Sequence, residues 1–337
     1  MTEARRYRDS GVDLQAAEAA RQRIARAVES TRSDIARGPV GGFGGMIAVP
    51  RGLVAPNLVM STDGVGSKVL VAIMAGVHHT IGQDLVNHCV NDVLVHGARP
   101  LAFQDYIAAH TLETDTVASL VDGVALACRA HETVLTGGET AQLPDLYRPG
   151  HYDLAGTILG IVGEESAIQG NDVALGDQVI AFPSNGLHTN GYTLARRVVF
   201  DDMGLDIGSP FPTGSTVAEE LLRVHRSYFR DVAPRLGAIK GLAHITGGGI
   251  PGNLPRTVRG TLGVKIDTGS WEIPELFCVI RDAGRITTEE MFEVFNMGVG
   301  LVAVVGPREV DAFLADTAGV GSWLLGEVVA EAGVRLG

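Results

Sequence analysis

The chain has few cysteines, few aromatic residues and no long apolar run. Only three of its 337 residues are cysteine, and Cys89, Cys128 and Cys278 lie far apart without CxxC or Cys/His spacing. The sequence therefore predicts neither a disulfide framework nor a structural zinc site. No stretch approaches the roughly 18 apolar residues of a membrane helix, and the first residues lack the apolar segment of a signal peptide. We expect a soluble cytoplasmic protein that does not bind membranes.

Basic residues are also in short supply. Lysine and arginine total 27 against 39 aspartates and glutamates, which gives a net charge of −12. Nonspecific nucleic-acid binding needs clustered basic side chains, so no nucleic-acid partner is expected. Small anions remain suitable ligands, because backbone N–H groups and bound Mg²⁺ can hold them. The 44 glycines are about 13% of the chain against a usual ~7%, and their clustering predicts specialised loops.

The length and the alternation of patterns predict two domains of mixed α+β and α/β type. A polar stretch at 163–177 is the best linker, which places the domains at 1–168 and 169–337. In the first domain we expect helices over 13–30, 84–100 and 115–131, and strands over 57–62, 101–107 and 154–162. In the second we expect strands at 179–182 and 301–305, and helices over 192–200 and 217–235.

The helix expected over 84–100 has two unlike faces. Its apolar face is formed by Leu85, Val86, Cys89, Val90, Val93 and Leu94. The opposite face carries Asp84, His88, Asn91, Asp92 and His96.

Three carboxylates lie beside glycine-rich segments or on that polar face, namely Asp63, Asp92 and Glu139. Mg²⁺ takes oxygen ligands and bridges polyphosphates, so convergent carboxylates would suit a nucleotide site. The alternative for each is an N-cap or turn aspartate. The chain has no GxxxxGK[ST], no GxGxxG after a first strand and no GxSxG, so P-loop, Rossmann and hydrolase-elbow sites lack their defining residues.

Other candidate residues could contact phosphate or move a proton. Lys68 could neutralise a phosphate, or it could be a solvated lysine. His188, between Gly186 and Gly191, is expected to be exposed and able to transfer a proton, or to be a structural loop histidine. Residues 246–249, TGGG, and Asn296 could present backbone N–H groups to an anion, or form tight turns.

Nine segments in order resemble the phosphoribosylformylglycinamidine cyclo-ligase, or aminoimidazole ribonucleotide synthetase, family. They are YRDSGVD, GGFGG, STDGVGSK, DLVNHCVNDVLVHGARP, GGETA, YDLAG, SNGLHTNGY, HITGGG and FNMGVG. The resemblance implies a homodimer whose N-terminal mixed sheets join into a barrel-like interface, each chain adding a C-terminal α/β domain with glycine-rich substrate loops. It implies ATP-dependent ring closure of formylglycinamidine ribonucleotide to aminoimidazole ribonucleotide in purine biosynthesis, with Mg²⁺ and allowing K⁺.

The resemblance also implies roles for individual residues. The catalytic residues would be His188, Asp92 and Lys68, and the metal ligands Asp63, Asp92 and Glu139. ATP would contact Asp63, Gly64, Gly66, Lys68, Asp92, Gly137, Gly138 and Glu139. Substrate would contact Gly42, Phe43, Gly44, Ser184, His188, Asn190, Thr246, Gly247, Gly248, Gly249 and Asn296, with Gly41 to Gly45 as a lid. The alternatives are another synthetase or kinase of the same superfamily, or a noncatalytic nucleotide-binding paralogue.

Overall fold

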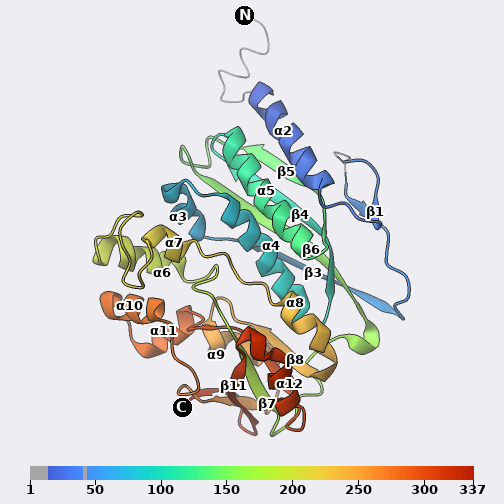
Figure 1. Cartoon of the computed structure of the whole chain (residues 1–337), viewed down its shortest axis with the longest axis vertical. Coiled ribbons are helices and arrows are strands. Elements are labelled where there is room, and N and C mark those ends of the chain that lie inside the picture. The colour runs from blue at the N-terminus through green and yellow to red at the C-terminus, as the bar shows by residue number, and fades with distance from the viewer. Residues whose placement is uncertain (1–13, 41–43) are drawn as a thin grey trace, which may run out of the picture.

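The computed structural model describes residues 14–40 and 44–337, in which two β-sheets lie one above the other, each with its own helices (Figure 1). The described chain begins with α2 (Leu14–Glu29), which matches the helix expected over 13–30. A short antiparallel pair follows, β1 (Ala36–Arg37) and β2 (Met46–Ile47). Within the described ranges, no helix is both long and apolar enough to cross a membrane.

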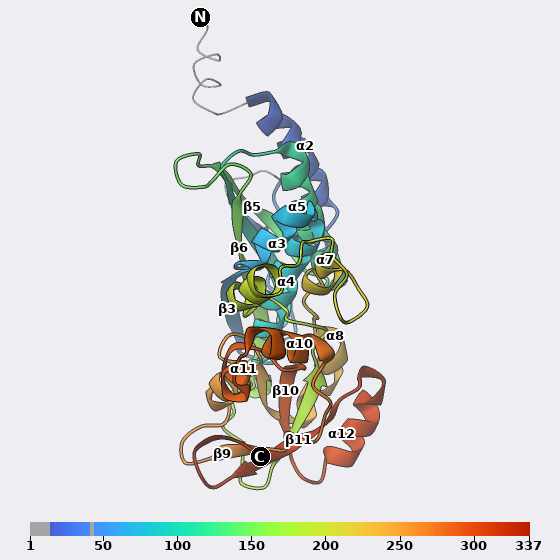
Figure 2. The same cartoon turned by 90° about the vertical axis from the view of Figure 1, so that its left-hand side faces the viewer.

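The N-terminal sheet has four strands in the order β3-β6-β4-β5. They are β3 (Pro56–Gly64), β4 (Arg99–Ala109), β5 (Val134–Gln142) and β6 (Tyr152–Gly163). Strands β4 and β5 are parallel and the other pairs antiparallel, so the sheet is mixed as expected. Three helices lie with it, α3 (Lys68–Ala75), α4 (His79–Leu94) and α5 (Thr114–Ala130), and α4 and α5 cover one face (Figures 1 and 2).

Helices α4 and α5 approach each other closely at two glycines. A Cβ atom on Gly82 would lie 2.1 Å from the carbonyl oxygen of Leu120, and one on Gly123 would lie 2.0 Å from the carbonyl oxygen of His79. Larger side chains at either glycine would push the helices apart. The apolar face predicted for α4 is confirmed, because its side chains are buried in the core beneath the helix.

No helix of the described residues lies on the other face of the N-terminal sheet (Figure 2). Leu58, Met60 and Tyr106 are exposed there, and the Met60 side chain retains 68% of its accessible surface. The Thr62 and Thr157 hydroxyls, 2.8 Å apart, join β3 to β6 on the same face. Side chains alternate along a strand, so the residues between these on β3 face the helices. One chain therefore exposes an apolar sheet face, called the open face below.

The C-terminal sheet has six strands in the order β12-β9-β11-β7-β10-β8. They are β7 (Gln178–Pro183), β8 (Ile239–His244), β9 (Gly263–Ile266), β10 (Val299–Val305), β11 (Trp323–Val329) and β12 (Gly333–Leu336). All residues of the interior strand β10 are buried, as expected for a strand covered on both faces. Strands β7 and β10 match the strands expected at 179–182 and 301–305, whereas the other four strands were not predicted.

Helices cover both faces of the C-terminal sheet (Figure 2). Ile180 and Phe182 pack with α8 (Phe229–Val232) and α12 (Val310–Thr317). Val179 and Ala181, which alternate with them, belong to the core shared with α9 (Gly249–Asn253), α10 (Glu275–Gly284) and α11 (Thr288–Val294). Alternation along β7 thus divides its side chains between two cores.

The remaining helical segments are short. Helix α6 (Tyr192–Arg196) continues into a π-helical stretch at Arg197–Asp202, and α7 (Val217–Leu221) is a single turn. The 3₁₀ turns are Glu164–Ser166, Ala233–Ala238, Leu254–Arg256 and Ala318–Val320. The prediction of one helix over 217–235 is wrong, because residues 223–228 between α7 and α8 are irregular. Those residues are called the connecting segment below.

Candidate active site

The polar face of α4 binds the backbone of the connecting segment. The Asp84 carboxylate accepts the backbone N–H of His225 at 2.7 Å, and the Asn87 amide donates to the His225 carbonyl at 2.8 Å. Asn91 donates to and accepts from the backbone further along, at 2.9 Å in each case. These side chains hydrogen-bond to backbone groups of the connecting segment, so the segment does not have to form a helix to pair those groups. The polar face therefore forms a junction between the two halves of the chain.

Lys68 takes a different place from the one expected. Its side chain is fully buried, and its Nζ lies 2.8 and 2.9 Å from the two carboxylate oxygens of Asp84 and 2.6 Å from the Arg223 carbonyl oxygen. Burial lowers the pKa of Lys68, and the Asp84 carboxylate opposes that change. With its donors directed at these partners, Lys68 is placed to hold the junction together, and the expected phosphate contact does not fit this geometry.

Asp63 and Asp92 lie together at the junction. His88 Nε2 is 3.1 Å from Asp63 Oδ2 and 3.9 Å from Asp92 Oδ2. The other Asp92 oxygen accepts from His244 Nδ1 at 2.8 Å, and Ser61 donates to Asp92 at 3.0 Å. Asp63 comes from β3, His88 and Asp92 from α4, and His244 from the end of β8. The site is thus assembled from both halves of the chain.

The pKa values at the junction follow from burial and from these contacts. Burial raises the pKa of Asp92, but the hydrogen bond and charge of His244 outweigh it and bring the value down to about 2. Burial lowers the pKa of His88, yet the Asp63 hydrogen bond and the Asp92 charge raise it overall. Burial lowers the pKa of His244. The Asp92 carboxylate is therefore ionised at neutral pH.

His188 is buried, which corrects the expectation that it is exposed. Its ring stacks on His225, with centroids 4.1 Å apart, and neither ring nitrogen has a hydrogen-bond partner. Its φ is +60°, and a Cβ on Gly300 would lie 2.7 Å from its Cε1. Burial lowers the pKa of His188 well below its usual value, so the ring is neutral. An unpartnered neutral imidazole, grouped with His225 and His244, is available for proton transfer.

The loop residues predicted to bind substrate meet at the same edge of the C-terminal sheet. Ser184 Oγ donates to Asn296 Oδ1 at 2.8 Å, and the Asn296 amide donates to the Gly186 carbonyl at 2.8 Å. This edge also carries His244, because β7 and β8 end there and the antiparallel β10 begins there. Ser184 and Asn296 are therefore brought together by the sheet.

The TGGG segment begins α9 beside the same loops. Asn253 donates to the Thr246, Gly247 and Gly249 carbonyls at 2.8 to 3.3 Å and so fixes the turn. A Cβ on Gly249 would lie 1.8 Å from the Phe292 carbonyl oxygen, so only glycine fits. A Cβ on Gly247 would lie 3.3 Å from the Asn190 side-chain oxygen, which places these two predicted substrate residues side by side.

Glu139 is not brought to Asp63 within one chain. Asp63 is on β3 and Glu139 on β5, the two opposite edge strands. Three strand-to-strand steps separate them, which is about 14 Å. GGET continues β5 and is not a loop, and a Cβ on Gly138 would lie 2.3 Å from the Asp105 carbonyl oxygen. The close approach of β4 therefore accounts for Gly138 without a phosphate.

The lid expected at 41–45 is described only in part, because Gly42 and Phe43 lie outside the described residues. Gly44 is exposed, and a Cβ on Gly45 would lie 2.3 Å from Thr136 Cβ. Gly64 and Gly66 lie at the end of β3 and in the turn before α3, and Gly66 has a positive φ of 67°. The contact of Gly45 with Thr136 shows that the segment before β2 packs against β5.

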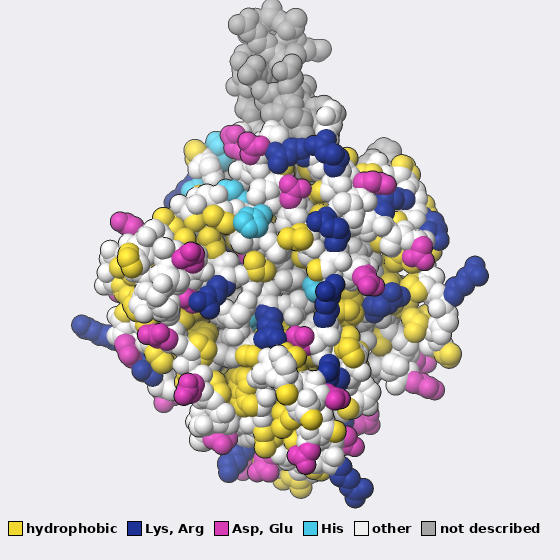
Figure 3. Space-filling model, in the orientation of Figure 1, with side chains coloured by type: hydrophobic (Ala, Val, Ile, Leu, Met, Phe, Trp, Pro, Cys, Tyr) yellow, Lys and Arg dark blue, Asp and Glu magenta, His cyan; other side chains and the backbone are white. Residues whose placement is uncertain are grey.

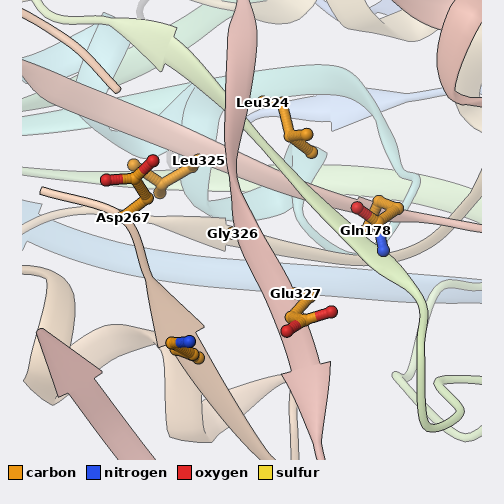
Figure 4. A pocket seen from close by; sticks show the side chains of 7 residues that line it. Gln178, Asp267, Leu324, Leu325, Gly326 and Glu327 are labelled. Carbon is orange, nitrogen blue, oxygen red and sulfur yellow. The ribbon is translucent and has the colours of Figure 1, made fainter. Parts of the chain in front are cut away.

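Two hollows away from the junction contain none of the expected site residues. One, of about 250 Å³, is lined by Gln178, Lys265, Asp267, Leu324, Leu325, Gly326 and Glu327 (Figure 4). The other, of about 680 Å³, lies between residues 164–172 and 236–240. Acidic and basic side chains are interspersed on the face shown in Figure 3. The junction is therefore the place where chemically active residues gather.

Comparisons with known proteins match both halves of the chain to one family. Residues 51–162 match the AIR synthase related protein N-terminal domain, and residues 174–337 match the C-terminal domain. The chain belongs to the AIR synthase related family. The phosphoribosylformylglycinamidine cyclo-ligase of Sorangium cellulosum is 46% identical over 332 residues, which are 96% of this chain and 95% of that protein. The cyclo-ligase of Pseudothermotoga lettingae is 43% identical over 326 residues, 96% of each chain.

Solved structures share the fold of this AIR synthase related chain. Thiamine-monophosphate kinase from Stenotrophomonas maltophilia superposes with a TM-score of 0.70 at 20% identity, covering 94% of this chain and 95% of that one. The hydrogenase maturation protein HypE from E. coli gives a TM-score of 0.65 at 18% identity, covering 94% and 92%. At these identities the likeness establishes the fold alone.

Three junction histidines of this AIR synthase related chain were not among the predicted site residues. They are His88, His225 and His244, which contact one another or the site carboxylates. One signal was available. Asp84, His88 and Asp92 are spaced four residues apart and share one side of α4, a pattern unusual for a solvated helix face. His225 and His244 lie in segments with no local motif.

Proposed function

We propose that the chain is a phosphoribosylformylglycinamidine cyclo-ligase, which uses ATP to close the imidazole ring of aminoimidazole ribonucleotide. The observation that carries the proposal is the identity of 46% to a curated cyclo-ligase over 96% of the chain. The junction supports it, because His88 contacts Asp63 and Asp92, and His244 contacts Asp92 and is grouped with His188. The kinase among the solved structures is 20% identical to this chain, a likeness that establishes the fold alone.

The reaction requires that the formyl oxygen become a leaving group and that a nitrogen of the substrate be held in position to attack. The γ-phosphoryl group of ATP passes to the formyl oxygen of the substrate, and ADP leaves. A nitrogen of the same molecule then attacks the activated carbon, a proton is lost, and phosphate departs with the oxygen. No protein nucleophile is required. Positioning and charge stabilisation supply most of the rate enhancement in such phosphoryl transfers.

His188 is the group proposed to move the proton. Its neutral ring has two unpartnered nitrogens, held by the stack on His225 and by the room that Gly300 leaves. Ser184, Asn190, Asn296 and the TGGG segment would hold the substrate and its 5-phosphate, because they converge on the same sheet edge. Backbone N–H groups of such a glycine turn suit a phosphate.

Asp63 and Asp92 are proposed to contact Mg-ATP. Both side chains are partly exposed, at 37% and 24%, and carboxylate oxygens suit a cation that accompanies polyphosphate. The cation would neutralise charge on the phosphates during transfer. Glu139, on the far edge of the sheet, would contact ATP only from a second copy of the chain. K⁺ dependence and a cytoplasmic location stay predictions.

The assay that tests the function supplies ATP, Mg²⁺ and formylglycinamidine ribonucleotide to the purified protein. ADP, phosphate and aminoimidazole ribonucleotide should form in equal amounts, because each ring closure consumes one γ-phosphoryl group. Product is followed by chromatography and phosphate by a coupled assay. ATP turnover without ring product would favour the alternative kinase or nucleotide-binding roles.

We also propose that the open face joins two copies of the chain into a homodimer. The face exposes Leu58, Met60 and Tyr106 and is covered by none of the helices in the described part of the chain, and large exposed apolar patches mark interaction sites (Figure 2). Met60→Asp should therefore convert the dimer to a monomer, because it places a charge on that apolar surface. Light scattering after size exclusion measures the mass.

Leu146→Asp is the matched control for the dimer test, because Leu146 is 77% exposed in the loop between β5 and β6. It should leave the mass of the assembly unchanged. A wild-type monomer, or an equal effect of both variants, would contradict the proposed interface.

A further inference from the structure

The chain contains two tryptophans, Trp271 and Trp323, and their rings lie side by side with centroids 6.1 Å apart. Trp271 lies in the segment after β9, and its ring also meets Phe292 of α11 edge to face. Trp323 begins β11 and is paired with Ala181 near the end of β7. Because β7 and β9 both end where the antiparallel β11 begins, the two rings lie at the sheet edge that carries Ser184.

The two indole N–H groups differ in their partners. Trp271 Nε1 donates to the Met297 carbonyl oxygen at 2.9 Å, whereas Trp323 Nε1 is buried and has no hydrogen-bond partner among the described residues. Met297 is 2% exposed, so water has little access to its carbonyl if the indole is removed. A buried acceptor without a donor is unfavourable. The Trp271 N–H therefore stabilises the backbone at Met297.

The backbone that Trp271 binds is a strained turn. Met297 and Gly298 both have a positive φ, of 51° and 94°. Glycine adopts that region readily, but the side chain of methionine disfavours it. A Cβ on Gly298 would lie 2.6 Å from Pro274 Cδ, so the turn also packs closely against the segment that carries Trp271. Strained residues persist only where surrounding contacts hold them, and they are common at ligand sites. The Trp271 hydrogen bond is one of those contacts.

The same turn holds two predicted substrate residues. Asn296, just before Met297, accepts with its Oδ1 from Ser184 Oγ at 2.8 Å. That oxygen also accepts from the Gly298 N–H at 2.9 Å, and the Asn296 amide donates to the Gly186 carbonyl at 2.8 Å. The Gly298 carbonyl in turn accepts the Ser184 N–H at 2.8 Å. A change in the turn would therefore displace Asn296 and Ser184 together.

We propose that Trp271 is a positioning residue of the substrate site, whose indole N–H holds the turn at Met297 and so keeps Asn296 and Ser184 in place to bind formylglycinamidine ribonucleotide. The inference rests on the proposed function in taking Asn296 and Ser184 as substrate contacts. A residue that orients binding groups contributes to substrate affinity more than to the chemical steps. ATP is assigned to the carboxylates of β3 and α4, so its binding should not depend on Trp271.

The first test is the steady-state kinetics of Trp271→Phe, which removes the indole N–H and keeps an aromatic ring. The KM for formylglycinamidine ribonucleotide should rise about 10-fold, the factor that corresponds to losing one hydrogen bond to a buried acceptor. Both kcat and the KM for ATP should stay within about twofold of the wild-type values. Trp323→Phe is the matched control, because it changes the other ring of the same pair but removes an N–H that has no partner. It should leave both KM values unchanged.

The second test keeps Trp271 in place, so a folding defect of its variant cannot confuse it. Protein that contains isotopically labelled tryptophan gives two indole N–H resonances by nuclear magnetic resonance, and Trp323→Phe identifies the one from Trp271. Formylglycinamidine ribonucleotide should shift the Trp271 resonance, because the substrate contacts connect to that N–H through the turn, and ATP alone should not.

Three results would overturn the proposal. They are an unchanged substrate KM in folded Trp271→Phe, an equal rise of that KM in Trp323→Phe, and a Trp271 resonance that stays in place at saturating substrate. Failure of the proposed function has a different signature, because the wild-type protein would then form no ring product in the cyclisation assay.

Discussion

Replacing His188 with phenylalanine should lower kcat by about 10²- to 10⁴-fold, the range expected for loss of a general acid or base. The protein should stay folded. Phenylalanine keeps a ring to stack on His225, where the centroids are now 4.1 Å apart, and it removes two buried nitrogens that have no partner. Deleting unpartnered buried polar atoms costs no hydrogen bond. Steady-state kinetics and thermal unfolding measure the two effects.

His131→Phe is the contrasting control. His131 is also buried, but its Nε2 is hydrogen-bonded to Asn87 at 3.0 Å, and it lies at the C-terminal end of α5 outside the proposed site. We expect it to lose about 1–3 kcal/mol of unfolding free energy and to keep kcat. A wild-type kcat in His188→Phe, or a loss of stability that accounts for its loss of activity, would make His188 structural.

Local patterns predicted the parts of the fold that local forces determine. The apolar period of α4 and the apolar runs of β3, β4 and β10 identified those elements, because burial of one face or of a whole strand leaves a mark in the sequence. The connecting segment carries no such mark. Its conformation depends on α4 side chains about 140 residues earlier in the chain, such as Asp84. Contacts of that separation override local propensity.

The sequence predicted the chemical type of the site but not all of the residues that form it. Asp63 and His188 could be predicted as site residues because each lies beside glycines. The strand order that separates Glu139 from Asp63 cannot be inferred from the sequence of either segment. His225 and His244 join the site only through tertiary structure. The burial of His188 was missed because a glycine-flanked histidine resembles an exposed loop residue, whereas Gly300 in fact makes room for its ring.

The polar face of α4 links these findings. A helix with one apolar and one polar face is ordinarily half solvated. Here Asp84 and Asn91 are fully buried and His88 is 5% exposed, so much of the polar face is buried as well. Asp84 and Asn91 bind the backbone of the connecting segment, and His88 and Asp92 are residues of the site. The site geometry therefore depends on the stability of the junction.

Lys68→Met should lower the free energy of unfolding by about 3–5 kcal/mol, because it leaves Asp84 buried without its ionic partner. The Arg223 carbonyl, now 2.6 Å from Lys68 Nζ, would also lose its donor. Adding Asp84→Asn should restore part of the loss, since asparagine is neutral and its side-chain oxygen can still accept the His225 N–H. Urea unfolding of the two single variants and the double variant gives the coupling energy of the pair.

Lys265→Met is the matched control, because Lys265 is exposed on β9 and its loss should change stability by no more than about 0.5 kcal/mol. The two roles considered for Lys68 differ in what they predict. A phosphate contact would cost activity while sparing the free energy of unfolding, and a junction residue would cost stability first. If Lys68→Met unfolds at the wild-type urea concentration but fails to use ATP, the ammonium must leave Asp84 to reach the nucleotide, and the buried pair is then a resting state of the site.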